Sequence, residues 1–229
     1  MPVPALDALM EDASLALGRM DYLACVQFCT RALELARRER RWSEYARILL
    51  PLQEARRQRR MRAVEGAIRL GTTASLTPAD LPPPPASYAL VLTHPLTRSD
   101  AQRLWAHLAS DPREGIILWA ESPADAPVWT ISTLSGPVAS CERPAPPAAW
   151  RDQWLSGSAS APLAGTSATP ADWVLDAGEA LGDAVLATLD PQVSGPELLA
   201  ALENCLRAAP DHEIIHQRLG SVARALARA

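Results

Sequence analysis

The stretch from Ala201 to Leu226, ALENCLRAAPDHEIIHQRLGSVARAL, has the pattern of one helix ending, a Pro-Asp turn and a second helix beginning. Leu202 and Leu206 lie one helical turn apart and therefore share a face of the first helix. Pro210 ends that helix because it has no backbone N–H, and Asp211 is placed to cap the next one with its carboxylate. The spacing predicts a helical hairpin at this end of the chain.

The same stretch contains a string typical of metal-dependent hydrolases, His212-Glu213-Ile214-Ile215-His216. On a helix, H-E-x-x-H places two imidazoles one turn apart, with the Glu as general base beside a zinc-bound water. A hydrolytic zinc site takes three protein ligands, and no Asp, Glu, Cys or His follows His216. We expect no bound metal or cofactor, and we keep a hydrolase using His212, His216 and Glu213 as an alternative.

Further residues of this region stand at the spacing of a helical-repeat signature: Leu198, Leu202, Pro210, His216, Leu219, Gly220 and Ala223. They match the A-x3-F…P and W-x2-L-G-x2-Y parts of the tetratricopeptide repeat, which this end of the chain resembles. The run Asp21–Leu35 resembles the second helix of the same repeat, with Cys25 and Cys29 where an Ala and an aromatic residue are usual. The resemblance implies helical hairpins that bind other proteins.

Composition excludes several classes of enzyme. All 22 basic residues are Arg, so the chain has no lysine for a Schiff base, a P-loop or a general base. The net charge of −4 predicts no general affinity for nucleic acid. The four cysteines form no C-x-x-C motif, and the chain shows no signal peptide and no apolar run of about 20 residues that could span a bilayer. We expect a cytoplasmic protein without a membrane partner.

The N-terminal region predicts helices over Ala5–Leu17, Tyr22–Arg38 and Ser43–Leu70, the second capped by Asp21. Pro51 lies inside the third helix and is expected to kink or split it.

The end of this third helix is rich in arginine. Its densest run supplies the candidate interaction residues, which are Arg56, Arg57, Arg59, Arg60 and Arg62. At helical spacing they point to most sides, and no aromatic residues are interleaved for base stacking. The sequence favours a solvated helix end, and a regulator that contacts nucleic acid through Arg56–Arg62 stays an alternative.

After a stiff run of four prolines at 82–85, the sequence pattern changes from helical spacing to short apolar runs. Apolar runs predict strands over Tyr88–Leu92, Gly115–Trp119, Trp129–Thr133 and Ala139–Arg143, with a helix capped by Ser99 and ending near Ala109 between the first two. A strand–helix–strand unit followed by closely spaced strands predicts a parallel pair and then antiparallel hairpins.

Three polar residues near the first strand form a candidate hydrolytic site. They are His94, Ser99 and Asp100. His94 follows a strand, where open sheets often place ligand-binding groups. The chain has no G-x-S-x-G, no G-x-G-x-x-G and no Gly-rich phosphate loop, so we assign no catalytic residue.

After a Ser/Ala/Gly tract, Pro170 opens a helix to Leu189, and Ser194 with Glu197 predicts a capping box for the next helix. The organisation that follows is: 1–70, tetratricopeptide-like helices; 71–86, Pro-rich linker; 87–155, small α/β module; 156–169, flexible loop; and 170–229, C-terminal tetratricopeptide-like helices.

The predicted fold is α+β, mainly α, with helical hairpins at both ends and a small α/β module between them. Because about three stacked repeats are needed to bury a continuous core, the two helical ends must pack together or the protein must form a homodimer. The predicted function is a non-enzymatic adaptor that binds an unidentified protein partner.

Overall fold

The computed structural model describes residues 6–71, 79, 86–108, 111, 113–156 and 169–229. The chain divides into two compact units. The helical unit comprises Met1–Arg59 and Leu189–Ala229, and the sheet unit comprises Arg60–Thr188. The two ends of the chain therefore belong to one unit, while the intervening residues form the other.

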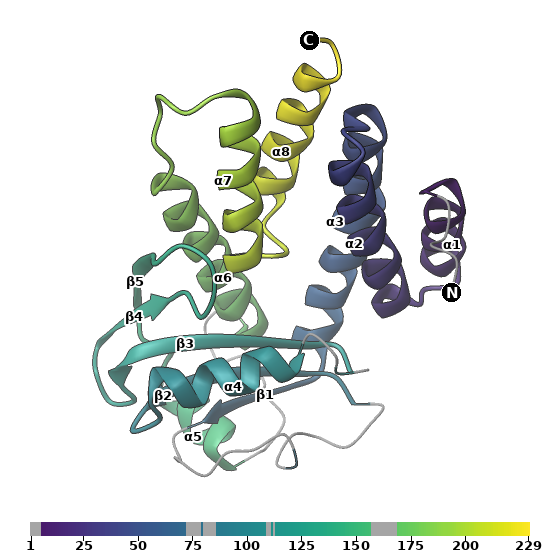
Figure 1. Ribbon diagram of the computed structural model, residues 1–229. Coiled ribbons are helices and arrows are strands. Elements are labelled where there is room, and N and C mark those ends of the chain that lie inside the picture. Colours follow the sequence, from purple (N-terminus) through teal and green to yellow (C-terminus); the bar gives the residue numbers. More distant parts are fainter. Residues whose placement is uncertain (1–5, 72–78, 80–85, 109–110, 112, 157–168) are drawn as a thin grey trace. The chain divides into compact units, whose positions relative to one another are not determined.

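The described residues form eight helices and one sheet (Figure 1). The helices are α1 (Leu6–Gly18), α2 (Tyr22–Arg38), α3 (Trp42–Glu65), α4 (Arg98–Leu108), α5 (Ala148–Ser156), α6 (Pro170–Ala187), α7 (Gly195–Ala208) and α8 (Glu213–Leu226). The strands are β1 (Ala67–Gly71), β2 (Tyr88–His94), β3 (Gly115–Pro123), β4 (Val128–Ser132) and β5 (Ser140–Pro144). The predicted class, α+β and mainly α, is confirmed. No helix among these is long and apolar enough to cross a bilayer.

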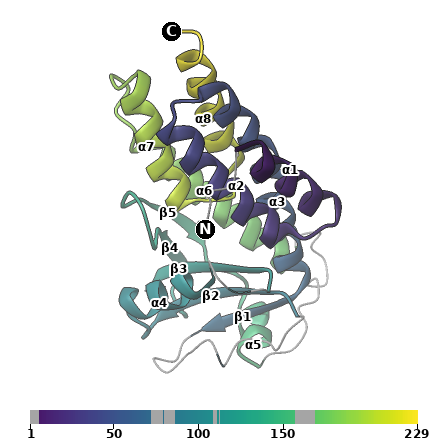
Figure 2. The same ribbon diagram turned by 45° about the vertical axis from the view of Figure 1, so that its right-hand side comes forward.

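In the helical unit, α1 packs beside α2 (Figure 2). Helix α2 has the predicted bounds, and the Asp21 carboxylate accepts a hydrogen bond from the backbone N–H of Ala24. Helix α3 runs through Pro51 without interruption, so the expected split does not occur. It also ends at Glu65 rather than Leu70, because the chain beyond it joins the sheet.

The N-terminal and C-terminal helices pack together within this unit. The Tyr45 hydroxyl on α3 donates to Glu203 on α7 at 2.8 Å. The same carboxylate pairs with Arg37 on α2 at 2.7 Å. Gly220 on α8 lies against Leu49 of α3. A Cβ added at Gly220 would lie 3.7 Å from the Cδ1 atom of Leu49, which is van der Waals contact. Of the two arrangements left open by the sequence, packing of the two ends within one chain is therefore the one observed.

The sheet has the order β1-β2-β3-β4-β5. Strands β2 and β3 are parallel, and β3–β4 and β4–β5 are antiparallel, as the strand spacing predicts. Strand β1 is additional and pairs parallel with β2, where the sequence predicted helix. The change of structure occurs at Gly66, where a Cβ would lie 2.1 Å from the Ser87 carbonyl oxygen. Only glycine permits this approach, which leads the chain from α3 directly into β1.

Side chains of the central strands alternate between two apolar layers. On one face, Ala89 and Val91 of β2 pack with Trp150 of α5 and with α6. On the other face, Leu90 and Leu92 of β2 pack with α4. The sheet is therefore covered by helices on both sides.

Three helix caps differ from the expected ones. At α4, Thr97 rather than Ser99 forms the cap, since Thr97 and Asp100 exchange hydrogen bonds. At α7, Ser194 is the cap residue but its side chain makes no cap bond, and the next residue is a left-handed glycine with φ of 58°. At α8, the cap position belongs to His212 instead of Asp211.

Helix α5 was not predicted. Helix α6, which the sequence grouped with the C-terminal helices, packs against β4 and β5 and has a complete Thr169–Asp172 capping box. The four-proline run and almost all of the Ser/Ala/Gly tract lie outside the described residues.

Candidate functional site

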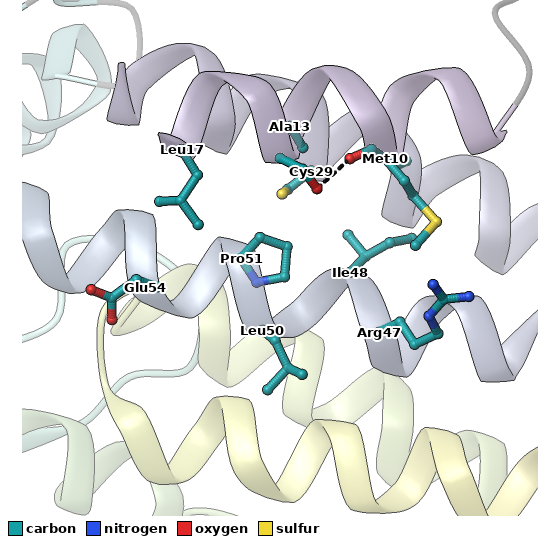
Figure 3. A pocket seen from close by; sticks show the side chains of 11 residues that line it. Met10, Ala13, Leu17, Cys29, Arg47, Ile48, Leu50, Pro51 and Glu54 are labelled. Carbon is teal, nitrogen blue, oxygen red and sulfur yellow. Dashed lines mark hydrogen bonds between the residues drawn. The ribbon is translucent and has the colours of Figure 1, made fainter. Parts of the chain in front are cut away.

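A pocket of about 440 Å³ opens in the helical unit between α1 and α3, with buried residues of α2 at its base (Figure 3). We call it the α1–α3 groove. It is lined by Met10, Ala13, Ser14, Leu17, Cys29, Ala32, Arg47, Ile48, Leu50, Pro51 and Glu54.

Both walls of the groove follow one helical spacing. The α1 wall presents positions i, i+3, i+4 and i+7, which are Met10, Ala13, Ser14 and Leu17. The α3 wall presents the same positions, which are Arg47, Leu50, Pro51 and Glu54. Residues at this spacing share one face of a helix, so each wall is about 10 Å long. Each wall combines apolar and polar side chains, because α1 adds Ser14 to its apolar residues and α3 adds Arg47 and Glu54 to Leu50 and Pro51.

The base of the groove is formed by small side chains. Cys29 and Ala32 of α2 are fully buried and lie one turn apart in the sequence. Their size leaves the space that a larger residue would fill. Of the apolar residues of the α3 wall, Leu50 is 67% exposed. The groove therefore combines an apolar interior with an exposed apolar edge.

Pro51 changes the hydrogen bonding of the α3 wall. In a regular helix, residue 51 would donate its N–H to the carbonyl of Arg47, four residues earlier. Proline has no N–H, so that carbonyl lacks its regular helical donor. Arg47 and Pro51 both line the groove, so this carbonyl belongs to a residue of the α3 wall.

The two charged residues of the groove differ in their surroundings. Glu54 accepts two hydrogen bonds from Arg57, at 2.8 and 2.9 Å, and one from Gln58. These hydrogen bonds lower the pKa of Glu54, and the contribution of Arg57 is larger than that of Gln58. Arg47 is exposed and has no hydrogen bond or ion pair with any described residue. The Arg47 charge does act on Glu44, one turn earlier on α3, whose pKa is lowered first by its hydrogen bond from Arg41. Arg47 is thus the cation that lines the groove, and it makes no direct hydrogen bond to a described acid.

Two thiols lie beside the groove. The Sγ atoms of Cys25 and Cys29 are 4.0 Å apart, and Cys25 also lies 3.7 Å from the Pro51 carbonyl oxygen. The hydrogen bond between the thiols lowers the pKa of Cys25 and raises that of Cys29, which burial raises further. All four cysteines of the chain are free thiols.

The H-E-I-I-H string does not assemble as a hydrolytic site. His212 stands at the cap position outside α8, while Glu213 is exposed and accepts a hydrogen bond from Gln217 at 2.7 Å. His216 is buried, and its Nε2 lies 2.9 Å from the Pro210 carbonyl oxygen. A carbonyl only accepts, so Nε2 carries the proton and donates. Within the described ranges, no group of three or more His, Cys, Asp or Glu could hold a metal ion.

The Pro210 carbonyl also accepts from Arg56 of α3 at 3.0 Å. Burial, followed by the nearby Arg56 charge, lowers the pKa of His216 to about 3. Burial likewise lowers the pKa of Arg56 to about 10. The histidine is thus neutral at pH 7, and one carbonyl at the α7–α8 turn connects both side chains.

The arginine run is divided among different contacts, and the expectation of a solvated helix end is wrong for Arg56 and Arg60. Arg60 is 15% exposed and forms an ion pair with Glu179 of α6. Arg57 is exposed and pairs with Glu54, while Arg59 and Arg62 are half-buried. Because the helical repeat points these side chains in different directions, the structure does not gather them into one basic face.

The residues of the candidate hydrolytic site share no hydrogen bond or ion pair in the described part of the chain. His94 is exposed at the end of β2, and Ser99 is exposed on α4. The Asp100 carboxylate accepts from the Thr97 backbone and hydroxyl, which lowers its pKa, and it pairs with Arg103. Its acceptor sites serve the cap of α4.

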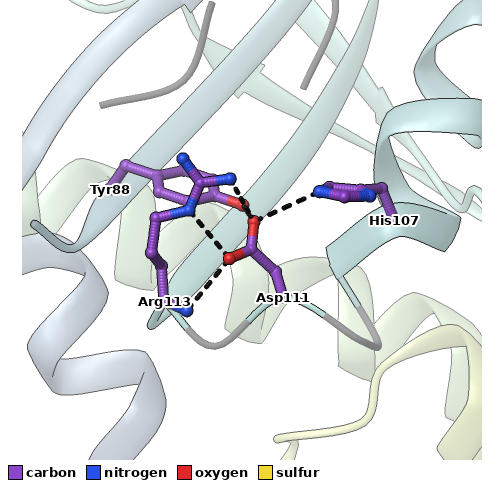
Figure 4. Close-up of polar contacts among 4 residues, drawn as sticks. All are labelled: Tyr88, His107, Asp111 and Arg113. Atoms are coloured by element: carbon purple, nitrogen blue, oxygen red, sulfur yellow. Dashed lines mark hydrogen bonds and ion pairs between the residues drawn. The ribbon is translucent and has the colours of Figure 1, made fainter. Parts of the chain in front are cut away.

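The sheet unit also contains a buried carboxylate, Asp111, which was not predicted as a functional residue (Figure 4). Asp111 accepts from the backbone and side chain of Arg113, from the Tyr88 hydroxyl at 3.3 Å, and lies 3.5 Å from His107 Nε2. Burial alone would raise the pKa of Asp111, but the Arg113 hydrogen bonds outweigh it and lower that pKa. The cluster joins Asp111 to Arg113, to Tyr88 of β2 and to His107 of α4, and the Asp-x-Arg spacing was its sequence signal.

No protein-family model, curated protein or solved structure matches the chain.

Proposed function

We propose that the protein is a non-enzymatic adaptor whose α1–α3 groove binds a segment of a partner protein. The observation that carries this proposal is the pocket between α1 and α3, which apolar side chains of both helices line together with the exposed Leu50. Single exposed leucines are common, but an exposed leucine continuous with an apolar pocket is typical of binding sites. Hydrophobic grooves on proteins bind amphipathic partner helices through the apolar face of the partner.

The resemblance to tetratricopeptide repeats supports the same proposal, because stacked helical repeats create concave binding surfaces. On this view the small Cys29, at a position where that repeat usually has an aromatic residue, is what leaves the pocket open. We also infer a cytoplasmic location, since four free thiols are typical of a reducing compartment.

The test places a photo-crosslinking amino acid at position 50 of the full chain in its native host. Position 15 supplies the matched control, because Leu15 of α1 is also an exposed leucine, at 50%, but does not line the groove. We expect a partner adduct at position 50 at least about tenfold stronger than at position 15. No adduct at position 50, or the same adducts at both positions, would refute the proposal.

A further inference from the structure

The polar groups of the α1–α3 groove differ in what they leave available to a ligand. The Ser14 hydroxyl donates to the Met10 carbonyl of its own helix at 2.9 Å. The Glu54 carboxylate is occupied by Arg57 and Gln58. Two groups of Arg47 remain: its guanidinium, and its carbonyl, which Pro51 deprives of the regular helical donor. One residue thus offers a cationic donor and a neutral acceptor at the same end of the groove.

The size of the pocket favours a bulky anchor. Its volume of about 440 Å³ exceeds that of any single aliphatic side chain, and two short side chains, Cys29 and Ala32, line it from α2. Tyr and Trp combine a large apolar ring with a donor that seeks a hydrogen-bond partner when buried. They are also the side chains most often found as binding hot spots in such pockets.

The charge of the groove favours an acidic neighbour for this anchor. Arg47 is the charged side chain of the groove that has no ion pair within the described part of the chain. Guanidinium groups recognise carboxylates through paired, charge-assisted hydrogen bonds. A basic partner segment would meet this charge without compensation.

We infer that the occupant of the groove is a partner segment in which a Trp or Tyr lies within one helical turn of an Asp or Glu. The aromatic ring enters the pocket, its N–H or O–H donates to the Arg47 carbonyl, and the carboxylate pairs with the Arg47 guanidinium. This inference rests on the proposed function and specifies its partner.

The experiment selects random 12-residue peptides displayed on phage against the full chain, with counter-selection on the Leu50→Asp variant. We expect the enriched peptides to share an aromatic residue and a nearby acid. One enriched peptide is then labelled, and its affinity is measured by fluorescence anisotropy. Enrichment of basic or purely aliphatic peptides, or no enrichment that depends on Leu50, would overturn the inference.

Variants separate the two parts of the recognition. Arg47→Glu should weaken binding at least about tenfold, and a peptide with its acid changed to Lys should bind that variant better than the original protein. Cys29→Phe should fill the pocket and weaken binding by a similar factor, with Ala32→Leu as a milder filling variant if the first melts early. Leu15→Asp should leave the affinity within about twofold. An unchanged affinity in Arg47→Glu would contradict the charge assignment.

Two further results distinguish this inference from the proposed function. If position 50 crosslinks a partner in the host while Arg47→Glu binds it normally, the groove binds proteins but the occupant is wrong. If light scattering shows a dimer that Leu50→Asp dissociates, the occupant is a second copy of the chain, and the inference also fails.

Discussion

Burial of a neutral His216 makes the helical unit sensitive to acid at a pH where most carboxylates are still ionised. The pKa of His216 is lowered to about 3 in the folded chain, against 6.5 for a histidine in water. Below pH 6.5 the unfolded chain binds a proton that the folded chain does not. The contribution of His216 to stability is therefore complete above pH 6.5 and is lost as the pH falls towards 3.

The size of the effect follows from the two pKa values. At pH 5 the unfolded histidine is almost fully protonated while His216 in the folded chain is not, and the loss is about 2 kcal/mol. Carboxylates with lowered pKa values, such as Asp111, add their own loss mainly below pH 5. Their contribution is the same in a variant that lacks His216, so it cancels when the two are compared.

The assay is urea unfolding at pH 8 and pH 5, followed by circular dichroism at 222 nm. The chain is compared with His216→Gln, in which the side chain at position 216 no longer titrates. We expect the free energy of unfolding to fall between the two pH values by about 2 kcal/mol more in the original chain than in His216→Gln. His94→Gln, at an exposed position, is the control and should keep the full pH dependence. Equal losses in the original chain and His216→Gln would show that the histidine is solvated in the folded state.

Three other predictions test the packing and the metal question. Leu219→Ala should lower the free energy of unfolding by about 2–5 kcal/mol because Leu219 is fully buried. Glu213→Ala, at the exposed first turn of α8, should lower it by at most about 1 kcal/mol. Equal losses in the two variants would contradict the packing of α8. A double-mutant cycle between Arg60 and Glu179, which is 41% exposed, should give a coupling of about 0.5–1 kcal/mol, and no coupling would mean that solvent screens the pair. Elemental analysis of untagged protein should find no stoichiometric zinc, and zinc that disappears when both histidines of the H-E-I-I-H string are replaced by alanine would restore the hydrolase alternative.

Local signals were sufficient for much of the fold. The bounds of α2 follow from its apolar stripe and from Asp21, and both act within a few residues. The parallel and antiparallel pairing of β2 to β5 follows from the lengths of their connections. Strand β1 was missed because its partner β2 lies across a long connection, and because the apolar spacing of Ala67 to Leu70 also fits a helix.

The groove could not be located from the sequence, although a helical groove was expected. Leu50 and Pro51 fit an apolar helix face, and nothing local shows that Leu50 stays exposed. That depends on how far α1 stands from α3, which is a tertiary property. The caps show the same limit. Ser194 is the cap residue of α7, as predicted, but its side chain makes no cap hydrogen bond, and the cap position of α8 is His212 rather than Asp211. By contrast, Trp150 and Trp154 lie one turn apart and could have indicated α5.

The discontinuity of the helical unit has a consequence for synthesis on the ribosome. Helices α1 to α3 leave the exit tunnel first, but the Glu203 carboxylate that joins Tyr45 and Arg37 is 158 residues away from Tyr45 along the chain. Every residue of the sheet unit emerges in the interval, in one continuous segment. Domains generally fold as units during translation, so the sheet unit can complete its folding while the first helices still lack their partners. Until α7 and α8 have been synthesised, the side of α3 that carries Tyr45 and Leu49 lacks its contacts with them. Exposed apolar surface of this kind is what chaperones bind.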